Sequence, residues 1–125
     1  MDVDKVITVP KMKTHNHKHA VVSLSLKNAM GVPPTPLYNM LEKDFFYKIK
    51  LHDYGLKNSI VDLNQIRMPD FAVIDGIVAM EGRGPTSGNS INSNVIIAGF
   101  DPVAVDTVGL TFMGFSVDEV PHITL

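Results

Sequence analysis

The chain has 125 residues, of which 45% are hydrophobic and 19% are charged, and its formal net charge is -2. This length and apolar content predict one globular domain over residues 1–125, large enough to bury a real core. A pI near 6.2 argues against a nucleic-acid binder, because that use needs a basic face over the whole domain. The chain has no cysteine to ligate an iron–sulfur cluster, and its apolar runs are too short for a membrane span. We therefore expect a cytoplasmic protein.

The N-terminal part predicts a strand followed by a cationic loop. Val6–Val9 is a β-branched apolar run that ends at Pro10, as expected of a buried strand. Three lysines and three histidines follow directly: Lys11, Lys13, Lys18, His15, His17 and His19. Open α/β sheets bind ligands at the carboxyl ends of their strands. This loop is therefore predicted to be a site for a small anion.

The next segment favours a second strand and then helices. Ala20–Leu26 alternates between apolar and small polar residues, which indicates a half-buried strand, and Lys27–Gly31 is expected to form a turn or a short helix. Two stripes at helical spacing follow a proline-rich connector. The first has Thr35 as N-cap and Pro36 in the first turn, and the second ends at Met68-Pro69-Asp70. The apolar positions of the two stripes are Leu37, Leu41, Phe45 and Ile49, then Leu56, Ile60 and Leu63.

In the second half of the chain, Phe71–Ile74 is a continuous apolar run typical of a central parallel strand, and Asp75 is expected to close it. A polar, glycine-rich loop is predicted from Glu81 to Asn94. Val95–Ala98 then predicts another buried strand.

The C-terminal part predicts a helix capped by Asp101, with Pro102 in its first turn and Gly114 at its end. A capping box is expected over Ser116–Glu119. The inward positions of the helix are expected to be Val105, Val108, Gly109 and Phe112.

These elements predict an α/β fold with a mostly parallel sheet and helices on both faces. The runs Val6–Val9, Phe71–Ile74 and Val95–Ala98 are expected to be neighbouring parallel strands. Their carboxyl ends would then place Lys11, Asp75 and Gly99 on one rim of the sheet.

Several short motifs, in order, resemble the DUF362 family, a domain of unknown function. They are Val9-Pro10-Lys11, Lys13-Thr14-His15, Leu26-Lys27-Asn28, Gly31, Asp75-Gly76, Glu81-Gly82, Gly84-Pro85, Gly88 and Asp101-Pro102-Val103-Ala104-Val105-Asp106. The resemblance covers nearly the whole chain. It implies an α/β domain of a kind often joined to ferredoxin-like iron–sulfur modules, which here would be a separate partner. Because sequence normally precedes the Val-Pro-Lys element, it also implies a domain shortened at its N-terminal part.

The histidines form the first candidate group. In an extended segment His15, His17 and His19 share one face and could ligate a transition metal. The alternative, a solvated polar loop, is favoured because no carboxylate or cysteine lies close by. We assign His15 as the proton-transfer residue and, with His17, as a candidate metal ligand.

Lys13, Lys27 and Asn28 form the second group, two cations and an amide able to clamp a carboxylate or phosphate. The alternative is that these are ordinary surface lysines. Lys27 closes an apolar run and is expected to be partly buried, and a buried lysine needs a partner or a lowered pKa.

The third group combines Asp75 and Glu81 with Gly82-Arg83-Gly84. Glycine N–H groups and Arg83 could approach an anion, while the carboxylates hold a cation or act as a base; the alternative is a plain turn-rich connection. Asp106 falls on an otherwise apolar helix, where it must be paired, exposed or functional, and we include it with the cofactor-binding candidates.

Two functions fit this sequence. One is an oxidoreductase-type or cofactor-handling domain that binds a small anionic substrate, with His15, Lys13, Lys27 and Asp75 as catalytic residues and electrons from an iron–sulfur partner. The other is a non-catalytic regulatory module that binds an anion or a metal. The sequence names neither the substrate, the cofactor nor the oligomeric state.

Overall fold

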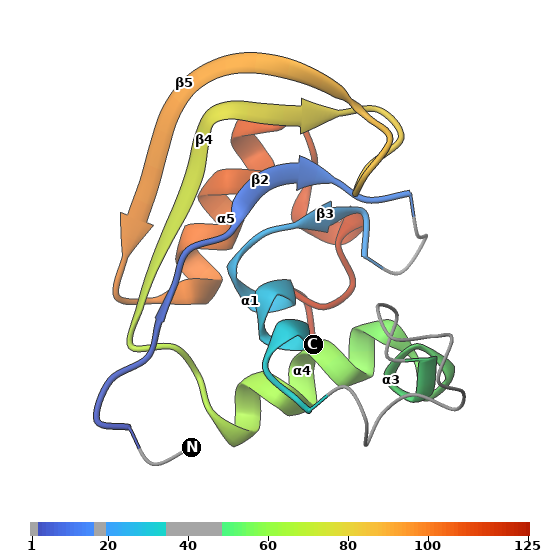
Figure 1. The fold of residues 1–125 in the computed structure, drawn as a ribbon, viewed down its shortest axis with the longest axis vertical. Helices are drawn as coiled ribbons and strands as arrows, with labels where there is room; N and C mark the ends of the chain where they lie inside the picture. Colours follow the sequence, from blue (N-terminus) through green and yellow to red (C-terminus); the bar gives the residue numbers. More distant parts are fainter. Residues whose placement is uncertain (1–2, 17–19, 35–48) are drawn as a thin grey trace.

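The computed structural model describes residues 3–16, 20–34 and 49–125, and it shows a five-stranded sheet with helices packed behind it (Figure 1). The predicted α/β fold class is confirmed. The helix expected to begin at Pro36 lies outside the described residues except at its end, where α3 covers Ile49–Asp53. The second predicted helix is α4, Leu56–Ile66, which buries Leu56 and Ile60 as its periodicity requires.

Two short strands share one edge of the central strand. β1 (Ile7–Thr8) and β2 (Lys11–Thr14) both pair in parallel with β4 (Phe71–Glu81), which confirms the predicted parallel pairing of Val6–Val9 with Phe71–Ile74. Pro10 separates β1 from β2 because it has no N–H to donate. Its carbonyl still accepts the N–H of Asp75 at 2.9 Å. The two strands therefore act as one interrupted strand along β4.

The other edge of β4 corrects two expectations. β5 (Asn89–Gly99) pairs with β4 in antiparallel fashion, so Val95–Ala98 is not a parallel neighbour. The connection is only Gly82–Gly88, whereas a parallel pair needs a crossover of about a dozen residues or more. The polar segment expected to be a loop is one only from Gly82 to Gly88, since β4 continues to Glu81 and β5 begins at Asn89.

The hairpin made by β4 and β5 bends sharply where its register shifts, between Gly76 and Val78 (Figure 1). Asn94 adopts φ 52 there, in the left-handed region that asparagine tolerates better than most residues. Gly99 pairs with Ala72, three residues before Asp75, and the partner of Asp75 on β5 is Ile96. The expectation that Gly99 shares a rim with Lys11 and Asp75 is therefore wrong.

The strand predicted over residues 20–26 is shorter than expected. β3 contains only Val22–Ser23, antiparallel to β2, and the chain turns into α1 (Ser25–Asn28) and η1 (Ala29–Gly31). The expected short helix near Lys27 is confirmed. The alternation of residues 20–26 does not separate the two structures, because a helix as short as α1 shows no full period of its own.

The C-terminal helix α5 (Pro102–Phe112) begins as predicted, with Asp101 accepting the N–H groups of Val103 and Ala104. Val105 and Gly109 are buried, but Val108 and Phe112 are about half exposed, contrary to the inward positions expected for them. The predicted capping box is present at η3 (Val117–Glu119), where the Ser116 N–H donates to Glu119.

The core lies between the sheet and α5. Ile74 of β4 meets Gly109 of α5 and Leu24, and these close contacts leave little room for a side chain at Gly109. In the view of Figure 1, α5 lies behind the sheet. Among the described helices, those that contact the sheet, α1 and α5, do so on this one face. The second helical layer that was expected is not found among the described residues.

Candidate functional site

The parallel strands β2 and β4 end side by side, and this places the cationic loop against the glycine loop. Lys13 is in register with Met80, so the residues that follow each strand are neighbours. The Thr14 hydroxyl donates to the Gly82 carbonyl at 3.0 Å, and the Asn16 N–H donates to the Gly84 carbonyl at 3.0 Å. This edge of the sheet is the one at which open α/β folds hold ligands.

Glycine is required at position 84 by the closeness of this contact. A Cβ atom there would lie 1.9 Å from the Thr14 carbonyl oxygen, well inside any van der Waals contact. Gly82 has φ 75, also a conformation that favours glycine. The glycines thus serve the packing of the loop on β2. The side chains of Glu81 and Arg83 remain exposed.

A cavity of about 330 Å³ opens beside the strand ends, bounded by Thr14 of β2, Glu81 of β4 and the C-terminal end of α5. Most of its lining is apolar: Met12, Ala79, Met80, Ile91, Phe112 and Met113. Glu81 is therefore placed at the rim of an apolar space, and it pairs with no cation in an ion pair among the described residues.

Lys27 is the most perturbed cation of the candidate site. It lies on α1 and is largely buried, and burial together with the nearby charge of Lys13 lowers its pKa to about 8. Neither lysine forms an ion pair with an acidic residue in the part of the chain that the structure describes. Two ammonium groups near each other without a carboxylate favour an anion between them.

Asp106 holds the helix that carries Lys27. Its side chain is fully buried, and its two carboxylate oxygens accept the N–H groups of Ser25 at 2.7 Å and Leu26 at 2.9 Å. Burial raises the pKa of Asp106 to about 6, against the lowering effect of these hydrogen bonds. The residue predicted as a cofactor ligand therefore has its oxygens turned to the backbone of α1.

Asn28 points in another direction. Its side-chain amide donates to the Thr8 hydroxyl at 2.8 Å, and both residues line a second cavity of about 330 Å³ at the start of β1. This cavity is bounded mainly by apolar residues of η1 and α4. Asn28 therefore belongs to a different surface from the strand ends at Thr14 and Glu81.

Asp75 is also apart from the strand ends, because β4 continues for six residues beyond it to Glu81. Its carboxylate accepts a hydrogen bond from Lys11 at 2.6 Å and another from the Ile77 N–H at 3.1 Å. The hydrogen bond from Lys11 is the main reason that the pKa of Asp75 lies below its ordinary value. The predicted closeness of Lys11 and Asp75 is confirmed, but at the middle of the strand.

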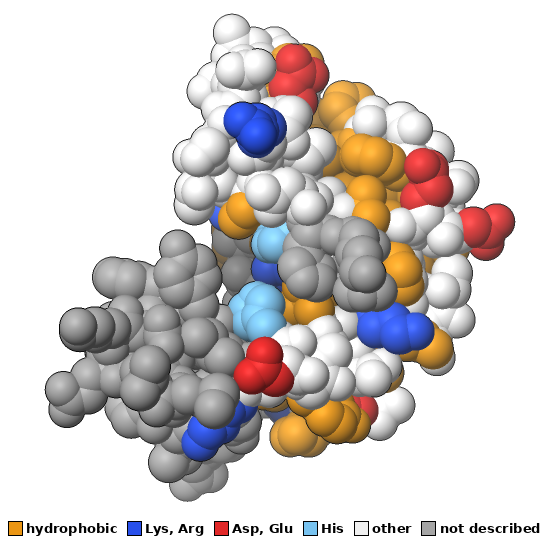
Figure 2. All heavy atoms as spheres, turned by 90° about the vertical axis from the view of Figure 1, so that its right-hand side faces the viewer, with side chains coloured by type: hydrophobic (Ala, Val, Ile, Leu, Met, Phe, Trp, Pro, Cys, Tyr) orange, Lys and Arg blue, Asp and Glu red, His pale blue; other side chains and the backbone are white. Residues whose placement is uncertain are grey.

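The histidines are only partly covered by the structure. His15 follows β2 and is partly exposed, and its N–H donates to the Val21 carbonyl at 2.6 Å, whereas His17 and His19 lie outside the described residues. Figure 2 shows histidine side chains gathered with a basic side chain in a hollow of the surface. Within the described ranges, no group of three or more histidine and acidic side chains is arranged to hold a metal ion.

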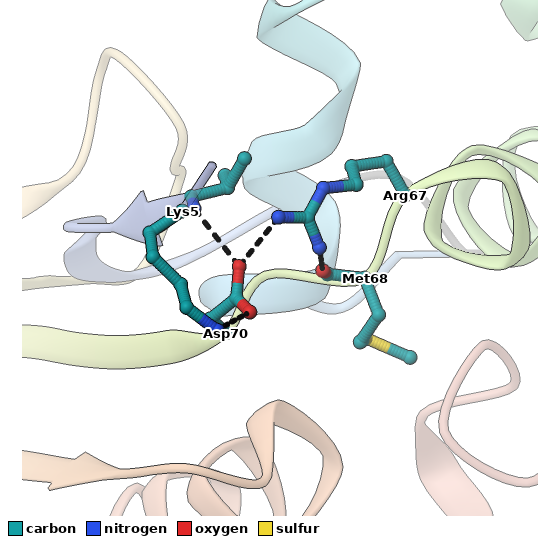
Figure 3. Close-up of polar contacts among 5 residues, drawn as sticks. Lys5, Arg67, Met68 and Asp70 are labelled. Atoms are coloured by element: carbon teal, nitrogen blue, oxygen red, sulfur yellow. Dashed lines mark hydrogen bonds and ion pairs between the residues drawn. The ribbon is translucent and has the colours of Figure 1, made fainter. Parts of the chain in front are cut away.

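One polar cluster was not foreseen. Asp70 accepts hydrogen bonds from Lys5 Nζ at 2.9 Å, the Val6 N–H at 2.9 Å and Arg67 Nη2 at 2.5 Å (Figure 3). These bonds, led by that from Val6, hold the pKa of Asp70 well below its usual range. The sequence shows Asp70 only as part of a helix-ending Met68-Pro69-Asp70 segment, and its partner Lys5 is too distant in the chain for a local pattern to show.

The fold and the site define an α/β domain with a cationic cluster at the carboxyl ends of two parallel strands. The family model described as "Domain of unknown function (DUF362)" matches residues 1–111, and the chain belongs to this family. It is 29% identical over 109 residues to the "Thylakoid-associated protein sll1697" of Synechocystis sp. (strain ATCC 27184 / PCC 6803 / Kazusa). That match covers 86% of this chain and 32% of the relative, so the chain spans about a third of that protein's length.

No solved structure matches the chain significantly. None of the helices in the described ranges is long and apolar enough to cross a membrane.

Proposed function

We propose that this DUF362 domain binds a small anion between Lys13 and Lys27, beside His15 and the Gly82–Gly84 loop. The observation that supports this most directly is that Lys27 lies largely buried near Lys13, while neither lysine forms an ion pair with an acidic residue of the described ranges. A bound carboxylate or phosphate would accept charge-assisted hydrogen bonds from both ammonium groups and remove their repulsion.

In this proposal His15 is the proton-transfer residue. It follows Lys13 by two residues at the end of β2, and its backbone is fixed by the hydrogen bond to Val21. An imidazole titrates near neutral pH, so it can take up or give a proton next to a bound anion. Asp75 has no part in this step, because its carboxylate is engaged by Lys11.

The oxidoreductase-type role needs a partner. These 125 residues contain no cysteine with which to ligate an iron–sulfur cluster, so electrons would come from an iron–sulfur partner outside them. A cytoplasmic location remains part of the proposal. Association with the thylakoid is stated for the Synechocystis relative alone.

Thermal melts with added anions test the binding site. Phosphate and small carboxylates should raise the melting temperature of the parent protein above that seen with chloride at equal ionic strength. The Lys27→Met variant should lose most of this protection. Lys57→Met is the matched control, since Lys57 lies on α4 and is also partly exposed, and it should be protected like the parent.

Equal protection of the parent and Lys27→Met would exclude the site. Where an anion binds, a turnover assay with a reduced ferredoxin-type donor distinguishes the two functions. Conversion that falls by roughly 100-fold in His15→Asn supports the enzyme, as expected for loss of general acid–base catalysis. Binding without conversion supports the regulatory module instead.

A further inference from the structure

The face of the sheet opposite α5 is an ordered apolar surface, which we call the outer face. Residues in register on β1, β2, β4 and β5 lie on it in three rows, together with Val9 and Phe100, which continue β1 and β5. The rows are Ile7, Phe71 and Phe100; Val9, Val73 and Ala98; and Lys11, Asp75 and Ile96. The rings of Phe71 and Phe100 confirm the first row, because their centroids are 4.9 Å apart in an edge-to-face contact.

The outer face exposes large side chains to a degree that a folded sheet seldom tolerates. The exposed fractions are 84% for Phe100, 62% for Val9, 61% for Ile7 and 59% for Ile96. Parallel strands normally have both faces covered. A contiguous apolar patch with a polar border marks an interaction surface.

The charges on this face are balanced and self-complementary. Lys11 and Asp75 are its two ionisable residues, and they pair with each other at 2.6 Å. A two-fold axis beside this pair would place Lys11 opposite the Asp75 of a second copy, and Asp75 opposite the second Lys11. Four alternating charges would then be surrounded by apolar contacts. A partner without such a pair of opposite charges would offer Lys11 and Asp75 no complementary charges.

We propose that two copies of this chain associate through their outer faces, about a two-fold axis beside Lys11 and Asp75. Such an isologous contact uses the same patch on both partners. A stable interface buries about 800 Å² per partner, with an apolar centre and a polar rim. In this contact the charged groups lie next to the axis, and the seven apolar side chains of the outer face surround them and supply the apolar area. The proposal is independent of the anion site, which lies at the ends of β2 and β4.

Sedimentation velocity of the 125-residue chain over a range of concentrations measures the association directly. The parent should shift from monomer to dimer as concentration rises. Ile96→Lys places a further charge in the row that holds Lys11 and Asp75, next to the two-fold axis, and should raise the dimer dissociation constant by at least about tenfold. Ile66→Lys is the matched control, because Ile66 is 80% exposed on α4, outside the outer face, and it should dimerise like the parent.

A charge exchange tests the two-fold axis. Lys11→Asp alone and Asp75→Lys alone should each be monomeric, because like charges would then meet across the interface. An equimolar mixture of the two variants should form a heterodimer, since each now complements the other. A parent that stays monomeric at every concentration, as expected if another protein or segment covers this face, overturns the proposal. So does a mixture that remains monomeric.

Discussion

Replacement of Asp106 by alanine should destabilise the protein strongly, because this carboxylate satisfies two backbone groups in the interior. The N–H groups of Ser25 and Leu26 donate to it at 2.7 and 2.9 Å, and Ser25, Leu26 and Asp106 are all buried. Alanine leaves both N–H groups without an acceptor. Water cannot replace the carboxylate without opening the contact between α1 and α5.

The expected magnitude follows from these two groups. A buried N–H that loses its partner costs about 1–3 kcal/mol, so two of them cost roughly 2–6 kcal/mol. Alanine within α5 offsets about 0.7 kcal/mol through its higher helix propensity. The free energy of unfolding of Asp106→Ala should therefore fall by roughly 1–5 kcal/mol at neutral pH, where the carboxyl, with a pKa of about 6, is ionised.

Asp101 provides a matched control in the same helix. It also accepts two backbone N–H groups, those of Val103 and Ala104, but it is exposed. Water can solvate these N–H groups once the side chain is removed, so Asp101→Ala should cost only about 1 kcal/mol. Urea denaturation followed by circular dichroism measures both variants, and an unchanged slope against urea would show that the transition stays comparable.

The comparison of the two variants shows whether the contribution of Asp106 to stability depends on its burial. Equal losses for Asp101→Ala and Asp106→Ala would refute the reasoning, because the two differ chiefly in access to water. A loss below about 1 kcal/mol for Asp106→Ala would show that Ser25 and Leu26 find other acceptors.

Three further variants test other parts of the structure by the same urea assay. The pKa of Lys27 is about 8 in the folded protein and 10.5 ordinarily, so between these pH values the unfolded chain binds more protons than the folded one. The free energy of unfolding of the parent should therefore rise from pH 8 to 10.5, by up to roughly 3 kcal/mol relative to Lys27→Met. Parallel pH profiles of the two proteins would contradict this. Gly84→Ala should cost more than about 2 kcal/mol because its Cβ meets the Thr14 carbonyl, whereas Gly31→Ala, which meets nothing within 4 Å, should change stability by less than about 1 kcal/mol. Asp70→Asn should be less stable than the parent at neutral pH, and the difference should shrink as the pH falls below about 3.8, since the folded pKa of Asp70 is depressed; a difference independent of pH would exclude the ionised cluster.

The elements that the sequence predicts well are those with local causes. Asp101 and Pro102 begin α5 because a capping side chain and a fixed φ act within one turn. Ser116 and Glu119 form their capping box for the same reason. The periodic residues of α4 likewise bury one stripe of the helix.

The direction of a strand has no such local cause. Val95–Ala98 is an apolar run that is compatible with either orientation, and the short Gly82–Gly88 connection decides for the antiparallel one. Residues 89–92, which are mostly polar, pair with β4 through their backbone, and composition does not reveal this pairing. For the same reason the sequence predicts that β4 ends at Asp75, whereas the strand continues to Glu81.

The candidate site was predicted in part. The sequence predicts a site after the first apolar run. The parallel pairing of β2 and β4 brings their ends together in this region, where Thr14 contacts Gly82. Asp75 was assigned to it only because the strand was expected to end there. The partner of Asp106 was not foreseen, since Ser25 lies 81 residues earlier in the chain.

The position of Lys27 shows how the fold maintains an unfavourable charge. α1 has four residues, too few to be stable as an isolated helix. Other elements fix its backbone by hydrogen bonds. The Asp106 carboxylate accepts the Leu26 N–H, and the Asn64 side-chain amide donates to the Leu26 carbonyl at 2.9 Å. Contacts with α4 and α5 thereby offset the cost of burying an ammonium group near Lys13. In the proposed function, binding of an anion relieves that cost, as does loss of the proton. Stability measured with and without added phosphate should therefore report occupancy of the proposed site.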